Sequence, residues 1–186
     1  MSKKWLCSDH HFGHANIIKH CDRPFNDVNH MDNELIERHN SLVAPNDLVY
    51  HLGDFCFDTP EVCMFYLERL NGKFIFIRGN HDYSLKGKKG EKILYKMHGK
   101  VLEITDYKEI KYNGETVVLF HYPMESWNKS FHGSVHFHGH THGTCPHEGK
   151  LRVDVGVDCW EFFPIELNKY YIEALKVFRT WPGERD

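Results

Sequence analysis

Residues 73–82, KFIFIRGNHD, place three chemically active side chains directly after a short apolar run. The run from Phe74 to Ile77 predicts a buried strand, because continuous apolar character over this length suits a strand covered on both faces. A glycine before Asn80 permits a tight backbone turn close to a charged centre. We therefore expect Asn80, His81 and Asp82 to lie beyond the strand end, where loops can direct several side chains at one point.

Four further blocks repeat this arrangement of polar side chains after a hydrophobic run. They are Asp9-His10-His11, Gly53-Asp54, His121-Tyr122-Pro123 and Gly139-His140-Thr141-His142. The chain contains sixteen histidines, and imidazole is the commonest metal ligand in proteins. One block alone would be weak evidence, since buried histidines with satisfied hydrogen bonds are ordinary. Five in succession are hard to explain by packing and indicate a shared site.

The spacing inside two of these blocks bears on how they would bind metal. Asp9 and His11 are two residues apart, so on an extended strand both would project to the same face and could hold one ion. His140 and His142 would do the same if extended, whereas in a turn they would diverge toward two ions.

The remaining sequence predicts alternating helices and strands, followed by a hairpin. The expected strands are 4–8, 48–52, 74–77, 107–112, 115–120, 134–137 and 151–155, and the expected helices are 29–43, a segment beginning at Thr59-Pro60, and 169–178. Asn113-Gly114 is a strong two-residue hairpin signal. The lysine-rich residues 86–90 are interpreted as a solvated loop. This pattern predicts one layered α/β domain with mixed sheets over residues 1–186.

The composition is that of a folded globular domain. Of the 186 residues, 41% are hydrophobic and 26% are charged. A net charge of −3 argues against a large non-specific nucleic-acid surface, which would be strongly basic. No apolar run approaches the roughly 20 residues of a membrane span, and the first residues show no signal-peptide pattern, so we expect a cytoplasmic protein. The six cysteines form no CxxC pair and predict free thiols.

In their order, the five blocks resemble the signature of the calcineurin-like metallophosphoesterase superfamily, which is DxH, GD, GNH[DE], a separate His and GHxH. The residues around Asp9, and those from His121 to Trp127, look most like small bacterial and phage members of that superfamily. The resemblance implies an α/β layered sandwich of two mixed β-sheets flanked by helices, with the metal site at the carboxyl ends of the strands.

The resemblance also implies two divalent metal ions per chain, bridged by Asp54. The first ion would be held by Asp9, His11, Asp54 and His142, and the second by Asp54, Asn80, His121 and His140. Mixed oxygen and nitrogen ligands without cysteine suit Mn²⁺, Fe, Zn²⁺, Co²⁺ or Ni²⁺ better than Ca²⁺, and Mn²⁺ is preferred.

Catalytic roles are implied in the same way. A hydroxide bridging the metals would attack phosphorus, and His81 would protonate the leaving group with Asp82 orienting it; a turn cap is the alternative for Asp82. Arg23 could contact a substrate phosphate or form an ordinary ion pair in its loop. Three more histidines, His10, His14 and His138, are expected to support the ligands by hydrogen bonds, with direct binding of a metal ion as the alternative.

The expected reaction is hydrolysis of a small phosphate ester, either a phosphodiester or a nucleotide-like substrate. A nuclease acting on polymeric nucleic acid is one alternative, but it would need a basic groove with aromatic side chains, which the acidic balance does not favour. A second alternative is a non-catalytic binding module of the same fold. Such a module would not need His81 and all seven ligand residues, so their presence argues against it. Trp127, Phe131 and His132 could stack on a base, with packing in the core as the alternative role.

Overall fold

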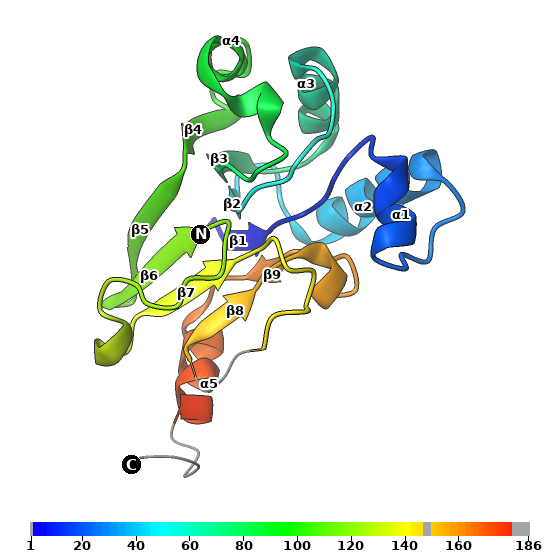
Figure 1. Cartoon of the computed structure of the whole chain (residues 1–186). Helices are drawn as coiled ribbons and strands as arrows, with labels where there is room; N and C mark the ends of the chain where they lie inside the picture. The colour runs from blue at the N-terminus through cyan, green and yellow to red at the C-terminus, as the bar shows by residue number, and fades with distance from the viewer. Residues whose placement is uncertain (1, 147–149, 180–186) are drawn as a thin grey trace.

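Two β-sheets pack against each other in the computed structural model of the chain, which describes residues 2–146 and 150–179 (Figure 1). The first sheet has the strand order β4-β3-β2-β1-β9. Its strands are β1 (Lys4–Cys7), β2 (Leu48–His51), β3 (Lys73–Ile77), β4 (Val101–Thr105) and β9 (Ile165–Glu166). Strands β1 to β4 run parallel, and β9 pairs antiparallel with β1, so the sheet is mixed.

The second sheet is also mixed and has the order β5-β6-β7-β8. Its strands are β5 (Tyr107–Tyr112), β6 (Glu115–Phe120), β7 (Val135–His138) and β8 (Arg152–Asp154). β5 and β6 form an antiparallel hairpin, whereas β6, β7 and β8 run parallel. At the hairpin turn, Asn113 has φ 50° and Gly114 has φ 86°. Positive φ at both central residues is what a type I′ turn requires, which explains the Asn-Gly pair.

Helices flank both sheets. They are α1 (Ala15–His20), α2 (Val28–Leu42), α3 (Pro60–Arg69), α4 (Gly87–Lys96) and α5 (Lys169–Arg179). In Figure 1, α1 to α4 lie on the side of the first sheet and α5 lies beside the second. Two of the helix starts are set by capping side chains, since the Asp27 carboxylate accepts from the backbone N–H of His30 and the Thr59 hydroxyl accepts from that of Val62.

Alternating side chains place the first sheet between two apolar layers. In β1, Trp5 and Cys7 pack into the layer formed with the helices, whereas Leu6 packs into the layer shared with the second sheet. Burying one large apolar side chain in this way contributes about 1.5–3 kcal/mol relative to leaving it exposed. Coverage on both faces also accounts for the continuous apolar run from Phe74 to Ile77.

The two mixed sheets flanked by helices confirm the expected fold class, but the interpretation of residues 86–90 as a loop is wrong. Helix α4 begins inside that stretch and buries Ile93, and Met97 at its C-cap is buried as well. Gly90, inside the helix, costs about 1 kcal/mol of helix propensity, and packing of the apolar face overrides that cost. Within the described ranges, no helix combines the length and apolar character needed to cross a membrane.

Parallel pairing brings the loops that follow the strands to one edge of the molecule. The carboxyl ends of β1, β2 and β3 meet there, and so do those of β6 and β7. Backbone hydrogen bonds join the loops directly: Asp9 N–H donates to Gly53 O at 2.9 Å, His11 N–H donates to Asp54 O at 3.0 Å, and Gly139 N–H donates to His121 O at 2.9 Å. The blocks picked out in the sequence therefore lie in adjoining loops.

Candidate metal centre

Six side chains from these loops form two adjoining groups. The first group is Asp9, His11 and His142, and the second group is Asp54, His121 and His140. Within each group, one nitrogen or carboxylate oxygen from each residue lies within 4.8 Å of the others. Each group combines carboxylate oxygen with imidazole nitrogen, which is a ligand set suited to divalent transition metals.

Asp54 belongs to the second group and also lies close to the first. Its Oδ2 is 3.6 Å from His11 Nε2 in the first group and 3.5 Å from His121 Nε2 in the second. Asn80 Oδ1 lies 3.1 Å from His121 Nε2. The structure thus brings together all seven side chains predicted to bind metal, with Asp54 at the position that a bridging ligand would need. Their roles as ligands stay a prediction.

The backbone of this centre is unusual. Five of the seven predicted ligands have positive φ: Asp9 (60°), His11 (53°), Asp54 (56°), His140 (71°) and His142 (46°). For residues other than glycine, this left-handed conformation costs roughly 1–2 kcal/mol each, and such strain clusters at functional sites. Asp9 and His11 lie beyond the end of β1 at Cys7, so they are not on an extended strand, yet both belong to the first group. His140 and His142 follow the turn alternative and diverge into different groups.

Hydrogen bonds fix which ring nitrogen of two histidines faces the centre. His121 Nδ1 lies 2.7 Å from Leu52 O. A carbonyl oxygen only accepts, so Nδ1 carries the proton and Nε2 keeps a lone pair toward Asp54. His142 Nδ1 donates to Asp158 Oδ2 at 2.7 Å in the same manner. A carboxylate or carbonyl that orients a ligating imidazole is the usual support for a metal-binding histidine.

His11 gives an independent indication that the groups fit a metal ion. Both of its ring nitrogens are buried and have no hydrogen-bond partner among the residues that the structure describes. A buried polar group without a partner is costly and rare in folded proteins. A divalent ion held with Asp9 and His142 would supply the missing partner for one nitrogen.

Burial shifts the protonation of the first group. It raises the pKa of Asp9 to about 7 and lowers the pKa of His11 to about 2. At His142 burial lowers the pKa, but the hydrogen bond to Asp158 and the charge of Asp9 outweigh burial, and the net pKa is raised. His11 is therefore ready to bind metal across the physiological range, whereas Asp9 and His142 must first release protons.

We predict that metal binding at the first group weakens as the pH falls below about 7. An ion there would bind the carboxylate of Asp9 and the neutral ring of His142. The pKa values of both groups are raised, so protons compete with the metal when the pH falls below these pKa values and do not compete above them. Mn²⁺ affinity measured from about pH 8 down to about pH 5 should fall, and the pH of half-maximal activity should move lower as free metal increases. An affinity that does not change over this range would contradict the assignment.

Close packing of the loops requires glycine at position 79. A Cβ atom on Gly79 would lie 2.1 Å from Asp54 Oδ1. We predict that Gly79→Ala displaces the Asp54 carboxylate and weakens metal binding at least tenfold, the scale seen when the support of a ligand is lost. Gly133→Ala is the control, because Gly133 has φ 89° with open space around its Cβ position. It should cost about 1 kcal/mol of stability and leave metal affinity unchanged; equal affinities in the two variants would refute this account.

The structure gives Asp82 a different role from orienting His81. Its carboxylate is buried and accepts from three backbone N–H groups, those of Asp54 (2.8 Å), Phe55 (2.9 Å) and Gly79 (2.8 Å). These bonds tie the loop after β2 to the loop after β3. Asp82 therefore links the two loops; it does not cap the short helical turn at Tyr83–Leu85, where its side chain forms no capping hydrogen bond.

His81 lies beside the centre and belongs to neither group. Its backbone N–H donates to Asp54 Oδ1 at 2.9 Å. Its ring is only partly buried, with centroid distances of 5.5 Å to His11 and 5.2 Å to Phe57. This placement lets the ring reach a substrate at the centre without binding metal.

Arg23 points inward, toward Asp158 and the loop that carries Asp9. Its guanidinium is buried and forms a two-point ion pair with Asp158, with Nε 2.7 Å from Oδ1 and Nη2 2.8 Å from Oδ2. The other N–H groups donate to Asp9 O, His10 O and Met31 Sδ. The ion-pair alternative is therefore the one found. These bonds occupy all the N–H groups of the guanidinium, so none is left to contact a substrate phosphate as predicted.

The three histidines expected to support the ligands make different contacts, and Nδ1 of His14 has no hydrogen-bond partner among the described residues. His10 Nδ1 lies 2.9 Å from His51 Nε2, and His51 Nδ1 accepts from Gly53 N–H at 3.3 Å, so His10 reaches the Asp54 loop indirectly. His138 Nδ1 donates to Gly139 O at 2.9 Å in the loop that carries His140. The ring of His14 stacks on Phe57 at 4.3 Å.

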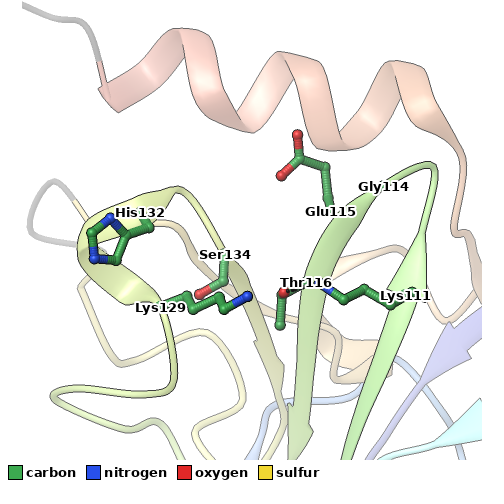
Figure 2. Close-up of a pocket in the computed structure, with 7 residues that line it drawn as sticks. All are labelled: Lys111, Gly114, Glu115, Thr116, Lys129, His132 and Ser134. Carbon is green, nitrogen blue, oxygen red and sulfur yellow. Dashed lines mark hydrogen bonds between the residues drawn. The ribbon is translucent and has the colours of Figure 1, made fainter.

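The three residues predicted to stack on a base, Trp127, Phe131 and His132, do not belong to either group of predicted ligands. Trp127 is buried, and its indole N–H donates to Ser134 O at 3.3 Å, so core packing is its role. Phe131 is 84% exposed on a short helical turn. His132 lines a hollow of about 280 Å³ that includes the first residues of β6, at the end of the second sheet opposite His121; the lining residues are Lys111, Gly114, Glu115, Thr116, Lys129, His132 and Ser134 (Figure 2).

Two exposed aromatic side chains at the centre were not expected from the sequence. Phe57 is 42% exposed and lies beside His14 and His81, and Tyr122 is 37% exposed with its ring 4.7 Å from that of His140. Tyr122 directly follows the predicted ligand His121 in the sequence, so its position near the centre could have been predicted. Phe57 lies beyond its block, and only the fold shows that it borders the centre.

Comparison with known proteins agrees with this geometry. Residues 4–161 match the family model described as the calcineurin-like phosphoesterase superfamily domain. The chain is 37% identical to the uncharacterized protein MJ1445 of Methanocaldococcus jannaschii over 97% of each chain, and 26% identical to the Gene 66 protein of Mycobacterium phage L5 over 86% of this chain and 88% of the relative. The crystal structure of the protein of unknown function AQ665 from Aquifex aeolicus shares the fold, with a TM-score of 0.72 and 24% identity over 94% of this chain and all of that one.

The family model covers most of the chain, and the archaeal relative aligns over nearly its whole length. Both agree with the two mixed sheets and with the cluster of aspartate and histidine side chains at their edge. The chain therefore belongs to the calcineurin-like phosphoesterase superfamily, a family of metal-dependent phosphoesterases.

Proposed function

We propose that this protein is a phosphoesterase with two metal positions that hydrolyses a small phosphodiester or nucleotide-like substrate. One observation carries the proposal: Asp54 Oδ2 lies 3.6 Å from a histidine of the first group and 3.5 Å from a histidine of the second. A carboxylate between two groups of ligands is suited to hold two ions close together, whereas a structural metal site needs only one closed group.

The chemistry follows from the charges and donors at the centre. Two divalent ions bound there would attract the phosphate, polarise its oxygens and lower the pKa of a water that serves as the nucleophile. Asp9 and Asp54 offset only part of the added charge, so a positive excess remains for an anionic substrate. Mn²⁺ is the ion we favour, because the donors are carboxylate, amide and imidazole and include no thiolate.

His81 is the residue we assign to proton transfer. Its ring is partly exposed and its centroid lies 5.5 Å from that of His11 in the first group, so it can reach the oxygen of a departing alkoxide. Imidazole titrates near neutral pH and is the side chain most often used as a general acid.

The exposed aromatic side chains support a substrate with a flat ring. Phe57 and Tyr122 border the centre near His81 and His140, respectively. Aromatic side chains of this kind stack on nucleobases or on aromatic leaving groups. A nucleotide-like ester fits this arrangement better than a small aliphatic phosphate.

Two other functions fit the structure less well. A nuclease acting on long nucleic acid would need a continuous basic surface, and the net charge of −3 does not favour one. A non-catalytic binding module would not need a complete set of ligand-type residues in costly left-handed conformations.

A panel of substrates distinguishes these functions. The protein loaded with Mn²⁺ should hydrolyse bis(p-nitrophenyl) phosphate or cyclic nucleotides faster than a single-stranded oligonucleotide, and removal of metal by chelation should abolish the activity. Preferential cleavage of the oligonucleotide would favour a nuclease. Metal binding without hydrolysis of any ester would favour the binding module.

A further inference from the structure

A buried ion pair forms hydrogen bonds to the ligands of the first group and to the loop that carries two of them. Arg23 is 4% exposed, and its guanidinium meets both carboxylate oxygens of Asp158, at 2.7 and 2.8 Å. The two residues lie 135 positions apart in the sequence. A planar guanidinium paired at two points with a carboxylate is rigid as well as strong.

The guanidinium also holds the strained loop after β1. Arg23 Nη2 donates to Asp9 O at 2.7 Å, and Nη1 donates to His10 O at 3.0 Å. These carbonyl groups belong to the segment in which Asp9 and His11 have φ of 60° and 53°. Left-handed residues persist only when surrounding contacts compensate their strain. Arg23 therefore fixes the backbone that presents two ligands of the first group.

Asp158 reaches the third ligand. Its Oδ2 accepts from His142 Nδ1 at 2.7 Å while the same carboxylate binds Arg23. This bond keeps the proton on Nδ1 of His142. The lone pair on Nε2 is then free to bind an ion together with Asp9 and His11. Arg23 and Asp158 thus contact all the loops that carry the first group.

The second group is supported by different contacts. His121 is oriented by Leu52 O, and the loops that carry Asp54 and Asn80 are joined by the Asp82 carboxylate. The hydrogen bonds of Arg23 and Asp158 described above go to the first group and its loops.

We infer that Arg23 and Asp158 are positioning residues that set the metal affinity of the first group and leave that of the second unchanged. The inference rests on the proposed function, since it assumes that both groups bind metal. It predicts that a substitution can lower the metal affinity of the first position without lowering that of the second. A purely structural ion pair would instead affect stability, or both positions equally.

The test is Mn²⁺ binding to the metal-free chain, measured by calorimetry in the wild type and in Asp158→Asn. The wild type should bind two ions. Asp158→Asn should weaken one of them by roughly 10–100-fold, the usual effect of losing the group that orients a ligand, and keep the other. In an Asn80→Ala background, where the second position is disabled, Asp158→Asn should weaken the remaining ion by the same factor.

Asp47→Asn is the matched control. Asp47 is a buried carboxylate that accepts from Lys3 N, Ala44 N and Trp5 Nε1, and it precedes β2 at the other end of the first sheet. It should lower stability without changing either affinity. Should Asp158→Asn not fold, Arg23→Lys keeps the charge, loses the two-point contact and carries the same expectation.

The possible failures are distinguishable. Two unchanged affinities in a folded Asp158→Asn protein, or an equal fall in both, would overturn the inference and leave the proposed function intact. A wild type that binds fewer than two ions would overturn the proposed function itself.

Discussion

Asp54→Asn should remove metal from both positions and lower the rate of ester hydrolysis by roughly 10³-fold or more. Oδ2 of this one carboxylate lies 3.6 Å from the first group and 3.5 Å from the second. An amide keeps the shape but loses the negative charge that would hold two cations together. A loss of 10³ corresponds to about 4 kcal/mol of transition-state stabilisation, which is within what bound metal ions supply.

Elemental analysis and activity together decide this prediction. Asn80→Ala is the comparison, because Asn80 Oδ1 lies 3.1 Å from His121 Nε2 of the second group and its loss should empty one position. If Asp54→Asn kept two metal ions and wild-type activity, Asp54 would not bridge them.

His81→Ala should lower the rate by roughly 10²–10⁴-fold while leaving metal content unchanged. The ring lies beside His11, and His81 belongs to neither group, so its removal takes away a proton donor and not a ligand. The stated range is that of a positioned general acid. The loss should be large for a poor alkoxide leaving group and small for p-nitrophenolate, which departs without a proton.

His132→Ala is the matched control, since His132 is an exposed histidine beside the hollow at the other end of the second sheet. It should change neither rate. Loss of metal in His81→Ala would make His81 a ligand or a structural residue. An equal rate loss for good and poor leaving groups would favour charge stabilisation over proton transfer.

Local sequence signals predicted most of the sheets correctly. The Asn113-Gly114 pair marks its hairpin because only a few residues tolerate positive φ at both central positions. The apolar run in β3 marks a strand covered on both faces. Helix α4 was missed because its glycine and lysine content suggests a loop, whereas tertiary packing of Ile93, and of Met97 at the C-cap, stabilises it.

The members of the site were predictable, but its geometry was not. The five blocks identify the side chains that the structure brings together, because each follows a strand end. The left-handed backbone at Asp9 and His11 leaves no mark in residue types, since φ is imposed by contacts such as those from Arg23. Pairing of Arg23 with Asp158 spans 135 positions, and one sequence gives no means of matching the two.

Asp82 shows how position in a motif can mislead. It follows His81 directly, which suggested that it orients that ring. Side chains at adjacent positions in a turn point in different directions, and the Asp82 carboxylate instead accepts three backbone N–H groups from the loops that carry Asp54 and Gly79.

The central claim is that two metal positions sharing Asp54 form a phosphoesterase centre. Titrating the metal-free chain with Mn²⁺ while following hydrolysis of bis(p-nitrophenyl) phosphate tests it most directly. We expect no hydrolysis without metal, binding of two ions per chain, and activity that reaches its maximum only as the second ion binds. Full activity of the metal-free chain, or full activity with a single ion bound, would contradict the account.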